Sequence, residues 1–181
     1  MTELKILTEV GICQPLFCWG YILQEYDFQV LKLTKDFYSD YPNPPYYEME
    51  MKETRRYNCL LIQSHYGYFI CVPFRSRVKH KYCYHFKKSV RSRKGQSALD
   101  YSKCAIINDL KYLDNNQGII DNDEYTEMMQ NINKIVSEVL SYVDDYVSFV
   151  NNESERISVQ EFKRRYQFST LQYFHEILGI K

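Results

Sequence analysis

Two apolar, aromatic runs separated by a short polar break most constrain what this chain can fold into. Residues 56–63 read RYNCLLIQ and residues 66–73 read YGYFICVP. Successive side chains of a strand point to opposite faces, so Cys59 and Leu61 share one face of the first run, as Ile70 and Val72 do in the second. Two such runs joined by a few polar residues that include Gly67 predict a β-hairpin.

Shorter segments on both sides of this hairpin predict further elements. Residues 28–33 are compatible with a short strand or with the end of a helix. Thr34 before KDFY predicts a helix start, and the proline-rich residues 41–45 predict a loop. Residues 82–86 and 103–108 predict two more strands. Residues 91–97 (RSRKGQS) predict a polar loop.

The last third of the chain predicts helices. Residues 109–127 are acidic and loop-like at first, and apolar residues then recur every three or four positions from Tyr125 to Val150, which predicts one helix of roughly 25 residues. Ser158-Val-Gln-Glu161 is a capping box that predicts a short helix. A last helix is expected from about Ser169 to Gly179.

The length of the chain and its mixture of elements predict a single α+β domain. The 181 residues suit one well-buried domain. We expect this domain to cover residues 28–181, with residues 1–27 as an N-terminal extension of uncertain role. No apolar run reaches the length of a membrane span, so we expect no membrane partner.

Positive charge is concentrated in residues 73–103. The whole chain balances 23 basic against 23 acidic residues, yet this stretch carries ten Lys and Arg side chains against the single Asp100, a net charge of +9. Such a concentration predicts contact with a polyanion, whereas the plainer interpretation is a solvated lysine-rich loop. Tyr82, Tyr84 and Tyr101 lie among these charges, and aromatic faces are what single-stranded bases stack on.

Residue types near the start of this stretch suit cleavage of RNA without a metal. The reaction needs a base for the 2′-OH proton, an acid for the leaving 5′-oxygen, and cations for the transition-state charge. Arginine clamps phosphate, serine is a short donor, and histidine or a lysine with a lowered pKa can move protons. His85 competes with His80 for the proton-transfer role. The candidate catalytic residues are Arg56, Arg75, Ser76, Lys79 and His80.

The remaining polar and aromatic residues of the stretch are candidates for RNA binding. We expect its cations to contact the phosphate backbone, its tyrosines to stack bases, and Asp100 to organise the surface by hydrogen bonding. These candidates are Lys81, Tyr82, Tyr84, Lys87, Lys88, Arg91, Arg93, Asp100, Tyr101 and Lys103.

The sequence offers no motif for a metal or a cofactor. It has no CxxC pair, no zinc-finger spacing, no HExxH and no nucleotide-binding glycine loop. Residues 121–124 (DNDE) are acidic enough for a cation, but a helix start that complements the macrodipole is the favoured interpretation. Cys59, Cys71 and Cys104 lie in apolar runs, where reduced cysteines pack as small hydrophobic residues. A reducing cytoplasm is the simplest setting.

Three segments together resemble a known family. They are Arg56-Tyr57 before the hairpin, PFRSRVKHKYCYHF at residues 73–86, and ALDYSKCAIIND at residues 98–109. They resemble the toxins of type III toxin–antitoxin systems, in particular the TenpN branch of the ToxN/AbiQ-like endoribonucleases. That branch carries PFRS-x-[IV]-x-H, a YCY-x-F piece and GLD[FY][ST]KA[VI][IV]. This chain has Ala98 where glycine is usual, and Cys104 intervenes between Lys103 and Ala105.

The resemblance implies a fold and an activity. The fold is a twisted, mainly antiparallel sheet of the PemK/MazF type with surrounding helices. The activity is a metal-independent, sequence-specific endoribonuclease in the bacterial cytoplasm that needs no cofactor and leaves a 2′,3′-cyclic phosphate. The antitoxin of such a toxin is a repeated pseudoknot RNA, which the toxin cuts into units and binds in a toxin–RNA hetero-oligomer. Its substrates are cellular or phage RNA, which is compatible with phage defence.

The resemblance also implies roles for particular residues. Arg56 takes the place of a functionally important lysine, Ser76 matches an active-site serine, and Arg75 replaces a neighbouring threonine. Val78 stands where the family has another lysine, and Lys79 follows it. Proton transfer is therefore left open between Lys79, His80 and Arg75. The alternative function is a non-catalytic RNA-binding regulator that uses the same basic groove.

Overall fold

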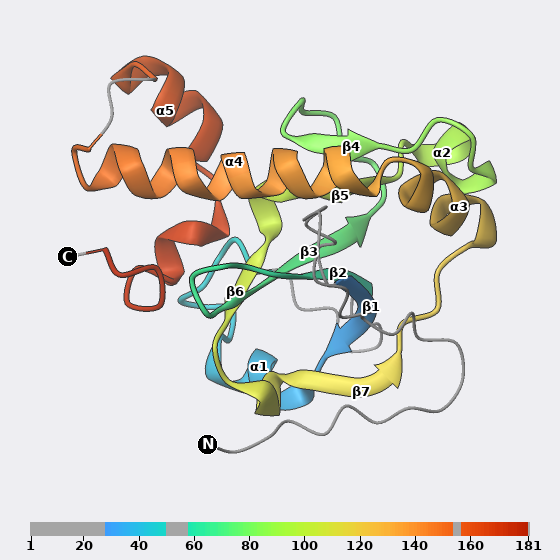
Figure 1. The fold of residues 1–181 in the computed structure, drawn as a ribbon, viewed down its shortest axis with the longest axis horizontal. Helices are drawn as coiled ribbons and strands as arrows, with labels where there is room; N and C mark the ends of the chain where they lie inside the picture. The colour runs from blue at the N-terminus through green and yellow to red at the C-terminus, as the bar shows by residue number, and fades with distance from the viewer. Residues whose placement is uncertain (1–27, 50–57, 154–156, 181) are drawn as a thin grey trace, which may run out of the picture.

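The structure, a computed structural model, describes residues 28–49, 58–153 and 157–180. The predicted extension at residues 1–27 and the candidate Arg56 lie outside the described residues. Most of the large buried side chains form one continuous hydrophobic cluster shared by the sheet and the helices. The expected α+β class with a mainly antiparallel sheet is confirmed (Figure 1).

In the part of the chain that the structure describes, seven strands form the sheet, in the order β4-β5-β3-β2-β1-β7, with β6 also paired to β3. Each pairing recorded for the described strands is antiparallel. The strands are β1 (Phe28–Leu33), β2 (Asn58–Gln63), β3 (Phe69–Arg75), β4 (Cys83–His85), β5 (Ala98–Asp100), β6 (Ala105–Ile107) and β7 (Leu113–Gln117).

Strand β3 lies at the centre of the sheet and places Arg75. It pairs with β2 over most of its length, which confirms the predicted hairpin. Its other edge is shared, because β6 pairs with the first half of β3 and β5 pairs with its last two residues. Arg75 ends the strand directly opposite Ala98, so the start of the basic stretch and β5 are neighbours in the sheet.

Within the described residues, five helices and three 3-10 turns surround the sheet. They are α1 (Lys35–Asp40), α2 (Val90–Gly95), α3 (Asn122–Gln130), α4 (Ile132–Val150), α5 (Val159–Tyr166), η1 (Tyr101–Lys103), η2 (Leu110–Tyr112) and η3 (Thr170–Tyr173). Figure 1 shows α4 crossing the β4–β5 end of the sheet, with α2 and α3 at one end and α5 at the other. The buried face of α4 runs from Ile135 to Tyr146 at helical spacing, as the sequence pattern predicts.

Several predicted elements are confirmed. Residues 28–33 form a strand rather than the end of a helix, and Thr34 is the N-cap of α1. Residues 82–86 and 103–108 contain the shorter strands β4 and β6. Ser158 caps α5, because its Oγ accepts a hydrogen bond from the Glu161 amide at 3.2 Å.

The single long helix predicted from Tyr125 is wrong. Helices α3 and α4 are separate, and Asn131 between them has φ −122° and ψ 13°. The side-chain amide of Asn131 donates to the Glu127 carbonyl at 2.8 Å. An asparagine that hydrogen-bonds nearby backbone offers an alternative to the helical ladder, so the chain can turn there.

Three other predictions are wrong in detail. Residues 91–97 were expected as a loop, yet Val90–Gly95 is helix α2, because Ser89 caps it by accepting from the Ser92 amide at 2.8 Å. The loop-like segment after Asp109 contains η2 and the edge strand β7. The expected last helix is only the turn η3, followed by hydrogen-bonded turns. Within the described ranges, no helix has both the length and the apolar character needed to cross a bilayer.

Candidate functional site

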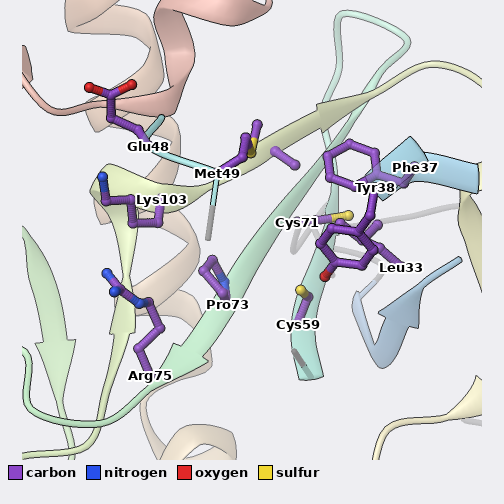
Figure 2. Close-up of a pocket in the computed structure, with 11 residues that line it drawn as sticks. Leu33, Phe37, Tyr38, Glu48, Met49, Cys59, Cys71, Pro73, Arg75 and Lys103 are labelled. Atoms are coloured by element: carbon purple, nitrogen blue, oxygen red, sulfur yellow. The ribbon is translucent and has the colours of Figure 1, made fainter. Parts of the chain in front are cut away.

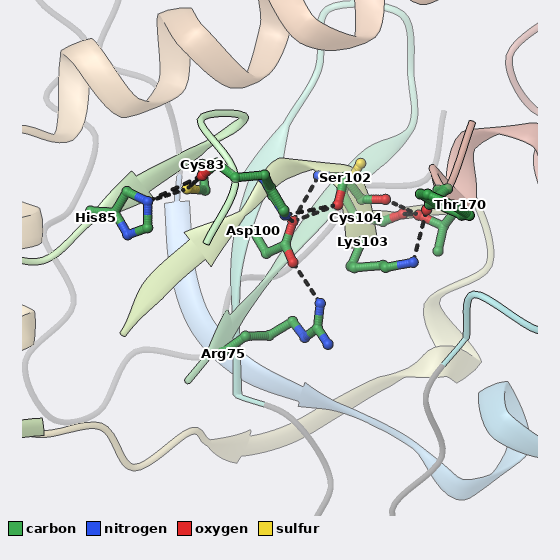
Figure 3. A network of polar contacts seen from close by, with 10 residues as sticks. Arg75, Cys83, His85, Asp100, Ser102, Lys103, Cys104 and Thr170 are labelled. Atoms are coloured by element: carbon green, nitrogen blue, oxygen red, sulfur yellow. Dashed lines mark hydrogen bonds and ion pairs between the residues drawn. The ribbon is translucent and has the colours of Figure 1, made fainter. Parts of the chain in front are cut away.

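A buried carboxylate, Asp100, organises the candidate site. It ends β5 and is 0% exposed. Arg75 Nη1 lies 2.6 Å from one of its oxygens, and the other oxygen accepts from the Ser102 amide at 3.0 Å and from Ser102 Oγ at 2.7 Å (Figure 3). An aspartate commonly accepts from backbone two residues ahead, so the same carboxylate also caps η1.

His80 completes this group, which we call the Asp100 cluster (Arg75, His80, Asp100 and Ser102). His80 Nε2 lies 3.3 Å from Asp100 Oδ1 and 3.4 Å from Ser102 Oγ. His80 Nδ1 is buried and has no hydrogen-bond partner within the part of the chain that the structure describes. Asp100 therefore holds the histidine ring by one nitrogen, and the other nitrogen is inside rather than at the surface.

The surroundings of Asp100 favour its charged form. Burial by itself would raise the pKa of this carboxyl, but hydrogen bonds from His80 and Ser102 and the charges of His80 and Arg75 outweigh it, so its pKa is lowered. The carboxylate is thus ionised at neutral pH and holds a fixed negative charge beneath Arg75. Asp100 makes the predicted kind of hydrogen bond, but it is fully buried and lies beneath the surface that RNA would contact.

A cavity of about 40 Å³ lies beside the cluster. Arg75 and Lys103 line one side of it, and the aromatic residues Phe37 and Tyr38 lie on the opposite side (Figure 2). This volume holds a water molecule or two rather than a nucleobase. The useful feature is its rim, where two cations from different elements lie close together.

The turn after β3 carries two more candidates, Ser76 and Lys79, and both are exposed. Arg77 between them has φ +62°, the left-handed region that non-glycine residues rarely adopt. The turn is held because the Arg77 amide donates to the Gly95 carbonyl and Val78 is buried. Ser76 and Lys79 are therefore displayed to solvent next to the cluster, and the structure does not bring them into contact with Asp100.

The basic arm, residues 81–94, is held by a second buried carboxylate. Glu127 of α3 is 5% exposed and accepts from the Lys87 amide at 2.9 Å and from the Lys88 amide at 2.9 Å. The carboxylate contacts the backbone, and the side chains of Lys87 and Lys88 are exposed. Tyr84, Lys87 and Lys88 also line a cleft of about 370 Å³ between this arm and helices α3 and α4.

The acidic run at residues 121–124 does more than complement a helix dipole. Asp123 accepts from the Val90 amide at 2.9 Å, and the fully buried Glu124 accepts from the hydroxyl of Ser89 at 3.2 Å. Arg91 Nε lies 3.6 Å from Glu124. The run therefore fixes α2 and the end of the basic arm. In the described residues no group of three or more acidic, histidine or cysteine side chains is arranged to hold a metal ion.

The predicted base-stacking tyrosines are largely engaged within the protein. Tyr101 is 4% exposed, and its hydroxyl donates to Glu138 at 2.7 Å, so its ring is part of the core. Tyr82 is half-buried, its hydroxyl donates to Glu161 at 3.2 Å, and the Arg165 guanidinium lies 5.8 Å from its ring centre. Tyr84 is half-buried beside Glu127.

The structure brings some candidates together and separates others. Arg75, His80 and Asp100 form one cluster with Lys103 nearby, whereas Lys81, Lys87, Lys88 and Arg93 are exposed along the arm. Reasoning from sequence missed Ser102, although its place two residues after an aspartate is a known turn signal. It also missed Glu127, for which the sequence carries no comparable signal, and it noted the acidic run that contains Glu124 without predicting the contacts of that residue.

Comparison with models of known protein families, with curated protein sequences and with solved structures found no match for this chain.

Proposed function

We propose that this protein is a metal-independent, sequence-specific endoribonuclease with the fold of the ToxN-like toxins. The observation that carries the proposal is the Asp100 cluster, in which one buried carboxylate holds Arg75 and His80 beside a rim shared with Lys103. The cluster opens a stretch with a net charge of +9 in a neutral chain. Fixed cations next to a polyanion-binding arm suit phosphate chemistry.

The proposed reaction is attack of a ribose 2′-oxygen on the adjacent phosphorus. A general base removes the 2′-OH proton, the new P–O bond closes the 2′,3′-cyclic phosphate, and the 5′-oxygen leaves with a proton from a general acid. Arg75 and Lys103 stabilise the charge on the phosphoryl oxygens. Ser76 on the exposed turn donates a hydrogen bond to the same group.

Proton transfer in this proposal involves Lys79 and His80. Lys79 is exposed on the turn beside the cluster. His80 is oriented by Asp100, as carboxylates orient catalytic histidines elsewhere, but its Nδ1 is buried. His80 therefore acts on RNA only after the turn at residues 76–80 moves, a change that bound RNA would have to stabilise.

The biological setting of the proposal comes from the resemblance of three sequence segments to type III toxins. In that setting the antitoxin is a repeated pseudoknot RNA that the protein processes and that binds the basic arm in a toxin–RNA assembly. Cellular or phage RNA is the substrate in the bacterial cytoplasm. The exposed cations of the arm, at Lys81, Lys87, Lys88 and Arg93, support a polyanionic partner.

A cleavage assay in EDTA tests the activity directly. The purified protein is incubated with long single-stranded RNA, and the product ends are analysed for a cyclic phosphate. Arg75→Ala and His80→Ala should each lower the cleavage rate by about 100-fold or more, the range of a lost charge-stabilising or proton-transfer group. Lys35→Ala, which removes an exposed lysine of α1 outside the basic stretch, is the matched control. Intact RNA with the wild-type protein would refute the endonuclease.

One observation favours a second function, a non-catalytic RNA-binding regulator. The His80 side chain is 38% exposed, but its Nε2 lies 3.3 Å from Asp100 and its Nδ1 is buried, so both ring nitrogens are directed into the protein. A regulator would bind RNA with strong salt dependence and give no product in the same assay.

A further inference from the structure

Phe168 is an exposed aromatic residue whose near neighbours, apart from the exposed Gln167, are buried. It lies just after α5, and its side chain is 65% exposed. Tyr166 before it and Ser169 and Thr170 after it are all buried. Among the described residues, no aromatic ring contact involves Phe168. Single exposed apolar side chains are common on protein surfaces. A role for Phe168 therefore has to be argued from its position.

The position of Phe168 is set by Lys103. The Lys103 ammonium donates to the Phe168 carbonyl at 2.8 Å. Lys103 also lines the cavity that Arg75 lines, so both cations lie at one rim (Figure 2). The α-carbon of Phe168 is two bonds from the carbonyl oxygen that Lys103 contacts. The exposed ring therefore projects from the immediate neighbourhood of the Arg75–Lys103 pair.

The segment that carries Phe168 is anchored to the same part of the fold. The Thr170 hydroxyl donates to the carbonyls of Ser102 and Cys104, on either side of Lys103 (Figure 3). The Ser169 amide donates to the Tyr166 carbonyl at 2.9 Å. Phe168 is thus attached on its C-terminal side to η1, which begins directly after Asp100. Its backbone is ordered before any ligand arrives, which lowers the entropic cost of binding.

We propose that Phe168 stacks on a nucleobase of single-stranded RNA whose phosphate contacts Arg75 and Lys103. The inference rests on the proposed RNA site and adds its base-binding surface. A phosphate and the base of the same nucleotide lie on opposite sides of a ribose, so an aromatic ring next to a cationic rim matches one nucleotide. Stacking tolerates any base, because every base has a π-face.

Other aromatic residues fit this role less well. Tyr82 and Tyr101 of the basic stretch are engaged with Glu161 and Glu138. Tyr66 is 60% exposed, but it lies at the β2–β3 turn, the opposite end of β3 from Arg75. Tyr47 is 70% exposed, but its carbonyl accepts from the Asn43 side-chain amide at 3.3 Å, whereas the Phe168 carbonyl accepts from Lys103 itself. Phe168 is therefore the exposed ring that we place at the Arg75–Lys103 rim, because its carbonyl accepts directly from Lys103; Glu48 also lines that cavity.

The experiment measures binding without cleavage. The probe is a single-stranded 2′-O-methyl oligoadenylate of about eight nucleotides, within the range that single-stranded binding grooves cover. Its blocked 2′-oxygens cannot attack phosphorus, so affinity is separated from catalysis. Phe168→Ala should weaken binding about tenfold, the effect of one lost base stack. The Lys103 contact uses a backbone carbonyl and is kept. Tyr66→Ala is the matched control and should leave affinity unchanged.

A second variant provides a readout that a merely structural role would not move. Phe168→Trp, in a Trp19→Phe background, places the sole indole of the chain at the proposed stacking position. Its fluorescence should be quenched by the probe and its affinity should equal or exceed that of the wild type. Tyr66→Trp in the same background should not be quenched. If Phe168→Ala fails to fold, the fluorescence of Phe168→Trp still tests whether the side chain at position 168 stacks on a base.

The outcomes separate the two proposals. Unchanged affinity of a folded Phe168→Ala protein, or an unquenched indole at position 168 with bound probe, overturns the stacking role. Loss of affinity and quenching together with no RNA cleavage in EDTA support stacking and overturn the endonuclease. If the wild-type protein does not bind the probe at all, both the RNA site and the stacking role are wrong.

Discussion

Two regions of this molecule use a buried carboxylate to organise positive charge, and they do so in opposite ways. In the Asp100 cluster the carboxylate contacts side chains, namely the Arg75 guanidinium and the His80 ring. In the basic arm Glu127 contacts the backbone amides of Lys87 and Lys88. Both carboxylates are almost completely excluded from solvent.

The difference decides what each region can offer a ligand. The carboxylate of the cluster fixes the orientation of its cation and neutralises part of its charge, which suits a group that must be placed accurately. The carboxylate of the arm stabilises the chain path and leaves both lysine side chains in solvent, which suits long-range attraction and non-specific phosphate contacts.

Removing the charge of Asp100 should have the largest effect. Asp100→Asn keeps the size of the side chain but leaves the Arg75 guanidinium without its counter-charge, and we expect a loss of about 3 to 5 kcal/mol in the free energy of unfolding at pH 7, measured in urea. Asp109→Asn, at a carboxyl whose side chain is 48% exposed and which pairs with Lys111, is the control and should change stability by less than about 0.5 kcal/mol.

The loss of stability caused by Asp100→Asn should depend on pH. The pKa of its carboxyl is lowered in the folded protein from an unfolded value near 3.8. The stabilisation is therefore complete above that unfolded value and is lost as pH falls through the folded pKa. The difference in the free energy of unfolding between the wild type and Asp100→Asn should narrow below about pH 4. A gap of constant size between pH 7 and pH 3 would contradict the charge-based explanation.

Removing the carboxylate of the arm should have an intermediate effect. Glu127→Ala leaves the Lys87 and Lys88 amides without their acceptor, and we expect a loss of about 2 kcal/mol together with faster hydrogen exchange at these two amides. Glu127→Gln keeps one carbonyl oxygen as an acceptor, so its loss in the free energy of unfolding should be smaller. Equal losses in both variants, or unchanged exchange at the two amides, would show that Glu127 does not hold the arm.

The same contrast explains which parts of the molecule could be predicted from sequence. The β2–β3 hairpin was predictable because both strands are continuous apolar runs joined by a short polar break that includes Gly67. Asp100 was noticed because it is the single acid among ten cations. Strand β7 reads LDNNQ and joins the sheet by pairing with β1, without an apolar pattern of its own.

Helix α2 and the contacts that hold the basic arm were missed for a different reason. Their stabilising partners lie far along the chain, since Glu127 is 40 residues from Lys87 and Asp123 is 33 residues from Val90. Periodicity within a short window carries no information about such contacts. The exposure of Phe168 and the burial of Tyr101 likewise depend on how α5 and α4 pack. Neither could be predicted from residue type alone.

The smallest effect on stability is expected for the lysines of the arm. The double variant Lys87→Ala and Lys88→Ala removes exposed side chains and keeps both amides, so the free energy of unfolding should change by less than about 0.5 kcal/mol. Its RNA affinity should nevertheless fall. Each phosphate contact contributes about 0.7 to the slope of log K against log salt for a single strand, so the slope should become shallower by about 1.4.

Arg75→Ala supplies the comparison for this double variant. It should lower stability as well as RNA cleavage, because it also leaves Asp100 without its closest cation. Lys35→Ala should alter neither the salt slope nor the stability. If the double lysine variant instead destabilised the fold as much as Arg75→Ala, the lysine side chains would be structural, and the division between a placed cation in the cluster and free cations on the arm would fail.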